Sequence, residues 1–462
     1  MSNALIESHR WAVSEFGQAD LGDKRRTKRL VAIADDLATR PRGTMPDALK
    51  ELKDVKASYD FFSHPEITYA AVTAAHTSNT RQATFQPGEY FLVQDFTSLD
   101  FTEHWATTGL GFIGDGGGRG MYLSSTLALQ VHGWSEGGPN VGLLGLWDQE
   151  VWLRTETGRR RRETKAQRLQ RERESQHWAK AIAASDGPPA GARWTLIADR
   201  EADIFEVFQI CQERQVGFIV RAARPRALAG GAGKLFEAVG DAPVLGEYQV
   251  ALRARPGQPA RTATLNVQAA TVSLRGPWRP GGCLDALTLN VVQAIETNPP
   301  AGSDPLHWVL LTSWDVDTYA DAMKVIGAYT TRWLVEEYHK ALKTGTKVED
   351  SQLKTAKRLQ ALLGVLAIVA VRLLRLKLLV AVNPDEPLQP DEETQAILTI
   401  LEWQGRRPRE GWTNRTLLIT IAKQGGFLGR KRDGDPGWIT IWRGVKELAL
   451  MLQGYYAATG PK

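Results

Sequence analysis

Four short apolar runs dominate the middle of the chain and restrict what it can fold into. They cover residues 90–93, 194–198, 217–220 and 307–311. Uninterrupted apolar runs of this length are typical of strands that are buried on both faces of a sheet. Such a sheet needs helices to cover it, so the sequence predicts an α/β class of fold with a mixed central sheet and flanking helices.

The two ends of the chain have helical patterns instead. Near the start, Leu30, Ile33, Ala34 and Leu37 recur at helical spacing. Residues 320–380 are strongly helical, and a Pro-rich break at residues 383–390 indicates a linker before a further helical region. With 462 residues, the chain is long enough for several domains. We expect a helical N-terminal domain, a central domain and a helical C-terminal domain, at residues 1–70, 71–379 and 380–462.

The composition changes between about residues 227 and 305, inside the central domain. This segment is rich in Gly, Pro, Val and Thr, and its strands alternate in polarity, as at residues 248–253. Alternation of this kind predicts half-buried strands. We interpret the segment as an all-β insertion within the mixed domain.

Composition also excludes several classes of protein. Two cysteines cannot build a disulfide framework or a multi-cysteine zinc site, and they fit a reducing, cytoplasmic compartment. The first ten residues have no apolar signal core. The longest apolar stretch, residues 361–371, is followed by three cations and is too short to cross a bilayer, so we expect a buried helix and no membrane partner.

Positive charge is concentrated locally rather than spread over the chain, whose net charge is only +5. Residues 24–29 hold five cations in six positions, at the start of a helix that Asp23 would cap. Cations are unfavourable at that end of a helix, and external phosphates could neutralise them. Residues 154–173 hold nine cations and three glutamates. Both segments predict contact with a DNA backbone, and a solvated face or loop is the alternative for each.

Two aspartates stand where strand runs end. Asp95 follows the first run after one residue, and Asp199 follows the second directly. Ligands of open α/β sheets collect at the carboxyl ends of strands. Taken singly, each aspartate is better interpreted as a turn residue or a helix cap.

A third group of polar residues follows helical spacing. Its members fall within about an 80° arc of a helix at 100° per residue, with apolar residues on the opposite side. An ordinary amphipathic surface helix would also show this pattern. The polar face consists of Tyr329, Arg332, Glu336, Lys340 and Lys343.

Together, Asp95, Asp199 and Glu336 predict a site of three carboxylates. Hard divalent ions such as Mg²⁺ take oxygen ligands and accept phosphate oxygens in the remaining positions. Two such ions can activate a hydroxyl and stabilise the leaving oxygen in phosphoryl transfer. Nearby Lys and Arg residues would then hold DNA phosphates.

These residues resemble those of a known family, the bacterial DDE (Asp-Asp-Glu) transposases of the insertion-sequence-four family, in particular the Tn-five-type cut-and-paste enzymes. The resemblance covers nearly the whole chain, and its most specific part is the spacing Tyr-x-x-Arg-x-x-x-Glu-x-x-x-x-x-x-Lys. It rests on residues 11–12, 21–27, 94–99, 199–204, 218–221, 329–345, 425–431 and 436–438.

The resemblance implies an RNase H-like catalytic core interrupted by the β-rich insertion. It implies that Asp95, Asp199 and Glu336 bind two Mg²⁺ ions, for which Mn²⁺ would substitute. It implies terminal-repeat binding by the first 70 residues and dimerisation by the last 90. Residues implied to contact or support DNA are Arg25, Arg26, Arg29, Arg221, Trp308, Tyr329, Arg332, Trp333, Lys340 and Lys343, with Trp308 stacking on a flipped base.

The function implied is cut-and-paste transposition on double-stranded DNA by a homodimer. One strand is nicked, a DNA hairpin forms and opens, and the 3′-ends join target DNA. Two alternatives remain open: a catalytically silent DNA-binding inhibitor or repurposed transposase, and another RNase H-like metal nuclease. A C-terminal apolar stripe is interpreted as the dimer face or as packing within its own domain: Trp442, Val445, Leu448, Leu452 and Tyr455.

Overall fold

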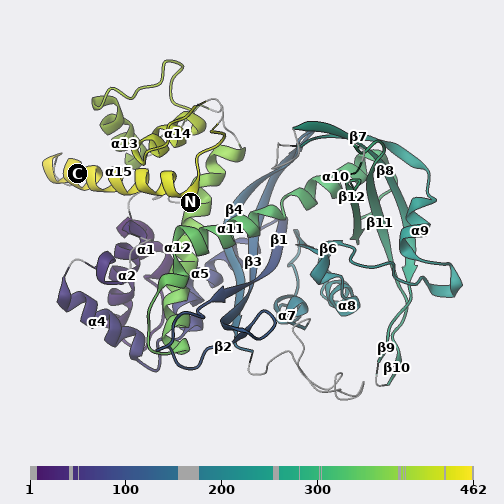
Figure 1. Cartoon of the computed structure of the whole chain (residues 1–462), viewed down its shortest axis with the longest axis horizontal. Helices are drawn as coiled ribbons and strands as arrows, with labels where there is room; N and C mark the ends of the chain where they lie inside the picture. Colours follow the sequence, from purple (N-terminus) through teal and green to yellow (C-terminus); the bar gives the residue numbers. More distant parts are fainter. Residues whose placement is uncertain are drawn as a thin grey trace.

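The computed structural model describes most of the chain between residues 8 and 459. Residues 41–44, 50, 155–175, 253–259, 280, 301, 303, 383–386, 389, 391 and 431–432 lie outside the description. The basic segment 155–173 and most of the predicted linker therefore cannot be compared with the structure. Figure 1 shows a large twisted sheet, helices around it and a separate group of helices at the C-terminal end.

The N-terminal region is helical, as predicted. The side chain of Asp23 accepts a hydrogen bond from the backbone N–H of Arg25 at 2.8 Å, so Asp23 does cap the basic helix. The four apolar residues Leu30, Ile33, Ala34 and Leu37 are buried on one face of that helix. The helices are α1 (Ser8–Phe16), α2 (Lys24–Thr39), α3 (Met45–Ala48), α4 (Leu52–Ser63) and α5 (Tyr69–Ala83).

Ten strands form one mixed sheet, in the order β2-β3-β1-β5-β6-β12-β11-β8-β7, with β4 paired to β3. The pairs β1–β5 and β5–β6 are parallel, and the other pairs are antiparallel. The strands are β1 (Gly88–Asp100), β2 (Gly111–Ile113), β3 (Gly118–Ser135), β4 (Gly138–Trp152), β5 (Ala192–Ala198), β6 (Gly217–Arg221), β7 (Val244–Leu252), β8 (Arg261–Leu274), β11 (Leu287–Glu296) and β12 (His307–Thr312).

Strand β1 is buried on both faces, which explains its continuous apolar run. Phe91 and Val93 belong to one hydrophobic cluster, and Tyr90 and Leu92 belong to the other. The first cluster includes α10 (Tyr319–Thr330), α11 (Trp333–Lys340) and α12 (Ala356–Val382). The second includes α7 (His177–Ala183), α8 (Phe205–Glu213) and α9 (Leu235–Gly240). The mixed α/β class predicted from the sequence is therefore confirmed.

The segment 227–305 is rich in strands, but the expectation of an all-β insertion was wrong. It contains α9 and a short 3₁₀ turn, Ala229–Gly231, and only the small hairpin β9 (Trp278–Arg279) and β10 (Gly282–Cys283) forms a sheet of its own. Its three long strands, β7, β8 and β11, continue the main sheet through β12. The backbone N–H and C=O groups along one edge of β12 therefore form hydrogen bonds with β11 of this segment.

The predicted helix from Tyr329 to Lys343 is not continuous. Helix α10 ends at Thr330, α11 begins at Trp333, and a π-helical turn, Ala341–Gly345, follows α11. The expected amphipathic pattern is nevertheless present, because Leu334, Tyr338 and the first residues of the π turn are buried while Lys340 is exposed.

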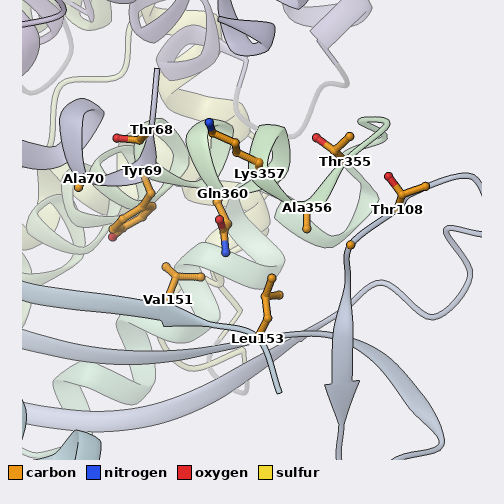
Figure 2. Close-up of a pocket in the computed structure, with 11 residues that line it drawn as sticks. Thr68, Tyr69, Ala70, Thr108, Val151, Leu153, Thr355, Ala356, Lys357 and Gln360 are labelled. Carbon is orange, nitrogen blue, oxygen red and sulfur yellow. The ribbon is translucent and has the colours of Figure 1, made fainter. Parts of the chain in front are cut away.

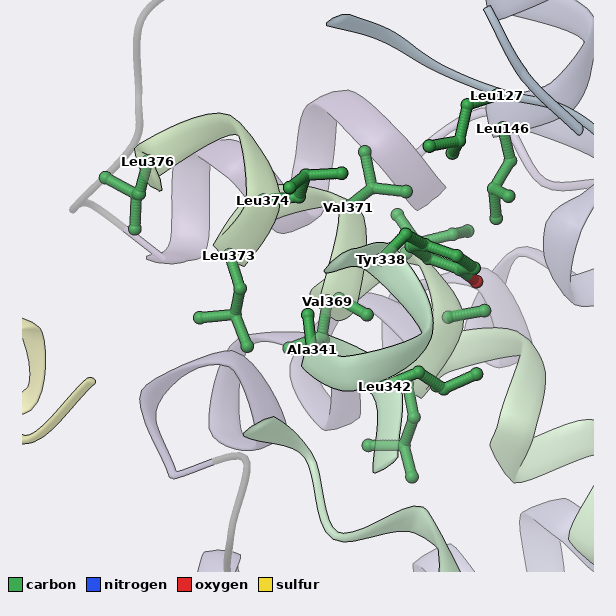
Figure 3. Close-up of a cluster of buried hydrophobic side chains, with 14 of the residues drawn as sticks. Leu127, Leu146, Tyr338, Ala341, Leu342, Val369, Val371, Leu373, Leu374 and Leu376 are labelled. Carbon is green, nitrogen blue, oxygen red and sulfur yellow. The ribbon is translucent and has the colours of Figure 1, made fainter. Parts of the chain in front are cut away.

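Helix α12 runs between the N-terminal helices and the sheet (Figure 1). Within the described residues, its segment Ala356–Leu378 is long and apolar enough to cross a membrane, and 89% of its most apolar window is buried. Every residue of the predicted stretch 361–371 is buried, which confirms a core helix. Figure 3 shows Val369, Val371 and Leu374 of α12 beside Tyr338 of α11 and residues of the sheet.

The C-terminal region forms α13 (Glu392–Trp403), α14 (Asn414–Gln424) and α15 (Trp438–Thr459), in agreement with the helical prediction. The predicted apolar stripe of α15 faces the protein interior. Trp442, Val445, Leu448 and Leu452 are buried, and Tyr455 is half-buried. Of the two interpretations, packing within its own domain agrees with the structure for the four buried residues, while Tyr455 keeps some exposed area.

Candidate active site

Asp95 and Asp199 lie at the same level on two neighbouring strands. Gln94 of β1 pairs with Ala198 of β5, so the next residue of each chain segment is an aspartate. Asp199 directly follows β5, as predicted, and its side chain accepts a hydrogen bond from the N–H of Glu201 at 2.8 Å. Asp95 differs from the prediction, because β1 continues to Asp100 and places Asp95 within the strand.

Glu336 comes to this pair from α11, in whose first turn it lies. The three carboxylates interact electrostatically. Burial, then the negative charge of Asp199 and, to a smaller extent, that of Glu336 raise the pKa of Asp95 to about 7. Burial and neighbouring negative charge both disfavour the ionised form of a carboxyl group, and both act on Asp95. The residues predicted to form one site therefore do lie together.

Arg332 lies between two of these carboxylates. Its Nη1 is 3.7 Å from Asp95 Oδ2, and its Nη2 pairs with Glu336. Burial disfavours the charge of Arg332, but the hydrogen bond to Glu336 and the nearby acids raise its pKa overall. Arg332 therefore partly neutralises the acidic cluster.

The donor set is of the kind that a hard divalent ion takes, because its three carboxylates supply oxygen ligands. In the present arrangement, the described residues contain no group of three His, Cys, Asp or Glu side chains placed to hold a metal ion. The oxygens are thus of the right kind and in the right neighbourhood, but Arg332 holds two of the carboxylates.

Further predicted residues surround this cluster. Arg221, the last residue of β6, donates a hydrogen bond to the His307 carbonyl at 2.9 Å and interacts with Tyr329. Burial raises the pKa of Tyr329, which stays neutral beside Arg332 and Arg221. Trp308 is half-buried on β12. Because Leu310 pairs with Arg221, Trp308 lies on the same sheet face as Arg221.

The cations after Glu336 lie close to the surface. Lys340 is exposed and pairs with Glu337 at 2.8 Å. An ordinary amphipathic surface helix would instead pair Lys340 with Glu336, four residues before it. Lys343 is half-buried in the π turn. Trp333, between Arg332 and Leu334, is 40% exposed.

The three N-terminal arginines have acidic partners within their own domain. Arg25 pairs with Asp23, Arg26 with Glu66, and Arg29 with Asp54. The side chain of Arg25 is still 90% exposed, so it remains accessible to a phosphate. Lys24 and Lys28 on the same helix are also exposed, and they complete a basic face.

Two kinds of residue near the site escaped the sequence analysis. Arg200 directly follows Asp199 and acts electrostatically on Arg221 and His307, and its position next to Asp199 could have revealed it. Ser125 and Gln149 carry no recognisable motif, because only strand pairing brings them next to Asp95 and α11.

Two family models match the chain, one at each end. A transposase DNA-binding model matches residues 8–67, and a model of the Tn5 transposase dimerisation domain matches residues 365–460. With the mixed sheet and its acidic site, these matches define a protein that binds DNA and forms a homodimer. These matches support a Tn5-type transposase, whose partners are DNA and a second copy of itself.

Because four residues of the predicted stripe of α15 are buried, we expect the dimer contact to use exposed residues of this region. Leu450 and Ile439 on α15 are 43% and 38% exposed, respectively. Leu450→Arg is expected to weaken dimerisation at least about tenfold, equivalent to about 1.4 kcal/mol, with little change in melting temperature. Leu448→Arg is the comparison, because it buries a charge and should unfold the domain. Sedimentation of DNA-bound protein measures the dimer, and unchanged dimerisation of Leu450→Arg would exclude this face.

The raised pKa of Asp95 predicts a pH-dependent cost to stability. Between its ordinary pKa of 3.8 and the folded value of about 7, the unfolded chain releases the proton first, so stability falls with rising pH. Asp95→Asn removes this cost and should stabilise the metal-free protein by roughly 2–4 kcal/mol at pH 8, and by much less at pH 4.5. Urea unfolding in EDTA at both pH values provides the measurement. A gain that is equal at both would contradict the assignment.

Proposed function

We propose that the chain is an active DDE transposase of the insertion-sequence-four family, with an RNase H-like core, that moves DNA by a cut-and-paste mechanism in the bacterial cytoplasm. The observation that carries the proposal is the electrostatic coupling of Asp95, Asp199 and Glu336, which come from two adjacent parallel strands and a helix. The matches to transposase domains at both ends are consistent with it.

Asp95, Asp199 and Glu336 would hold two Mg²⁺ ions, with Mn²⁺ as a substitute. When bound, these ions would polarise the scissile phosphate and lower the pKa of the attacking hydroxyl. The chain itself would exclude water around Asp95 through burial and orient the DNA end through its cations. Arg332 would exchange its carboxylate partners for a DNA phosphate, since an arginine binds either anion well.

In this proposal the DNA end lies along Arg221, Tyr329, Arg332, Lys340 and Lys343. Trp333 is exposed next to this row and is available for contact. The basic face of α2 binds the terminal repeat through Arg25, Arg26 and Arg29. Nicking, hairpin formation, hairpin opening and joining to target DNA would then follow at one site.

The test uses duplex DNA that ends in the inverted repeats flanking the gene, with Mg²⁺ present. We expect nicked, hairpin and joined products. Binding without any cleavage would favour the silent DNA-binding alternative. Cleavage with no joining, and no preference for the repeats, would favour a different metal nuclease.

Trp308→Ala tests the hairpin step separately. Extruding a base costs a few kcal/mol, and stacking on an aromatic ring returns about 1–3 kcal/mol. The substitution should leave nicking nearly intact and lower hairpin formation on the order of tenfold, whereas Trp308→Phe should retain most of it. Product gels and a melting curve provide the measurements. Equal losses of nicking and hairpin formation, together with a lower melting temperature, would assign Trp308 to the core alone.

A further inference from the structure

Three polar residues form a line across three neighbouring strands of the sheet. Asp95 of β1 pairs with Ser125 of β3, and Ser125 pairs with Gln149 of β4. Directly opposed residues of antiparallel strands place their side chains on the same face. Asp95, Ser125 and Gln149 therefore share the face that α11 covers.

Helix α11 contacts this line through the residues that follow Glu336. Gln149 Nε2 donates hydrogen bonds to Tyr338 OH at 2.9 Å and to Ser125 Oγ at 2.7 Å. The ring of His339 lies with Nε2 3.0 Å from the same Ser125 Oγ. Two consecutive residues of α11 are thus joined to Ser125, which pairs with Asp95, and to Gln149 on the next strand.

The Gln149 amide has a third partner. Tyr69 of α5 donates a hydrogen bond from its hydroxyl to Gln149 Oε1 at 2.6 Å. Both amide N–H groups and the amide oxygen are therefore in use, so removing the amide would break three hydrogen bonds. Figure 2 shows the ring of Tyr69 above Val151, in the wall of a pocket of about 630 Å³ between α5, β4 and α12.

These groups are buried, which makes the geometry rigid. Ser125 and Tyr338 are 0% exposed, and Gln149 is 8% exposed. Burial lowers the pKa of His339 to about 3, so its ring is neutral at physiological pH. Each buried polar group that lost its partner would cost about 1–3 kcal/mol, so few other positions of α11 on the sheet are accessible.

We propose that Gln149, acting with Ser125, is a positioning residue that determines the separation between Asp95 and Glu336. Asp95 belongs to the line of residues on the sheet, and Glu336 lies two and three residues before the side chains that bind this line. The proposal rests on the function proposed above, because the separation matters only if both carboxylates hold the same ions. Removing the Gln149 amide would let α11 shift and would weaken metal binding without removing any ligand.

The experiment compares Gln149→Met with Gln268→Met in the full-length protein. Gln268 on β8 is a close match, being 7% exposed and also making three amide hydrogen bonds. It donates to the carbonyls of Gly240 and Ala242 at 2.8 and 2.7 Å and accepts from Gln293. None of these partners belongs to α11. Both substitutions keep the side-chain volume and should lower the melting temperature by similar amounts.

Mn²⁺ is the probe, and its binding is followed by electron paramagnetic resonance. We expect Gln149→Met to weaken Mn²⁺ binding by about 10–100-fold and to lower the rate of end cleavage at unchanged DNA affinity. Gln268→Met should retain wild-type Mn²⁺ affinity. Equal Mn²⁺ affinities of the two variants would overturn the positioning role of Gln149.

Asp95→Ala separates this proposal from the proposed function. If Asp95→Ala loses Mn²⁺ but Gln149→Met keeps wild-type affinity, the metal site stands and the role of Gln149 is wrong. If Asp95→Ala binds Mn²⁺ as the wild type does, the assignment of the metal site is wrong, and the positioning role of Gln149 is then wrong as well.

Discussion

Replacing Asp95, Asp199 or Glu336 with Ala is expected to lower the rate of strand cleavage by at least on the order of 10³-fold. Each substitution removes one of the three carboxylates that interact in the site. Binding to terminal-repeat DNA should remain, because cations contacting phosphates contribute most of the affinity. Cleavage assays in Mg²⁺ and gel-shift titrations on the same DNA measure the two effects.

Asp100→Ala is the matched control for Asp95→Ala. Asp100 is the last residue of the same strand and is exposed, five residues beyond Asp95. Its substitution should leave cleavage unchanged within a few-fold. Wild-type cleavage by Asp95→Ala would refute the assignment of the site.

Glu15→Gln is expected to reduce the free energy of unfolding by about 3–5 kcal/mol. Glu15 on α1 accepts from His76 of α5 at 2.6 Å and from Arg375 of α12 at 2.9 Å. The ring of His76 also accepts the backbone N–H of Leu146 on β4 at 3.0 Å. One carboxylate therefore joins the DNA-binding helices to the body of the protein, and Gln would leave Arg375 without its anion.

The pH dependence of this contribution follows from the pKa of Glu15. Burial opposes the charge, but His76 and Arg375 outweigh it and lower the pKa from 4.5 to about 2. The stabilisation is fully present above pH 4.5 and is lost as the pH falls toward 2. Urea unfolding of the wild type and Glu15→Gln at pH 7 and pH 3 should show the difference shrinking at low pH. Glu136→Gln, in an exposed turn, is the control and should change little.

Local patterns predicted the elements of this protein well. The apolar runs became β1, β5, β6 and β12, since a strand buried on both faces needs apolar residues at every position. Asp23 capped α2, and the stretch 361–371 became the buried α12. These properties depend on neighbours in the chain, so they can be recognised in a single sequence.

Local sequence patterns predicted only part of the site. Asp199 ends its strand as expected, but the end of β1 lies at Asp100, because pairing with β3 continues through Asp95 to Gly120. The helix of Tyr329 to Lys343 is broken at residues 331–332 and again by a π turn, although its polar spacing is regular. Pairing partners and packing partners decide where an element ends, and these partners lie far away in the chain.

The roles of residues that carry no sequence motif follow only from contacts with residues far away in the chain. Gln149 is 189 residues from Tyr338 and 80 from Tyr69, yet it binds both. The apolar spacing on α15 was read correctly as one helix face, but only packing against α13 and α14 decided that this face is internal. Periodicity shows which residues share a face, while burial of that face depends on the surfaces that the folded chain brings against it.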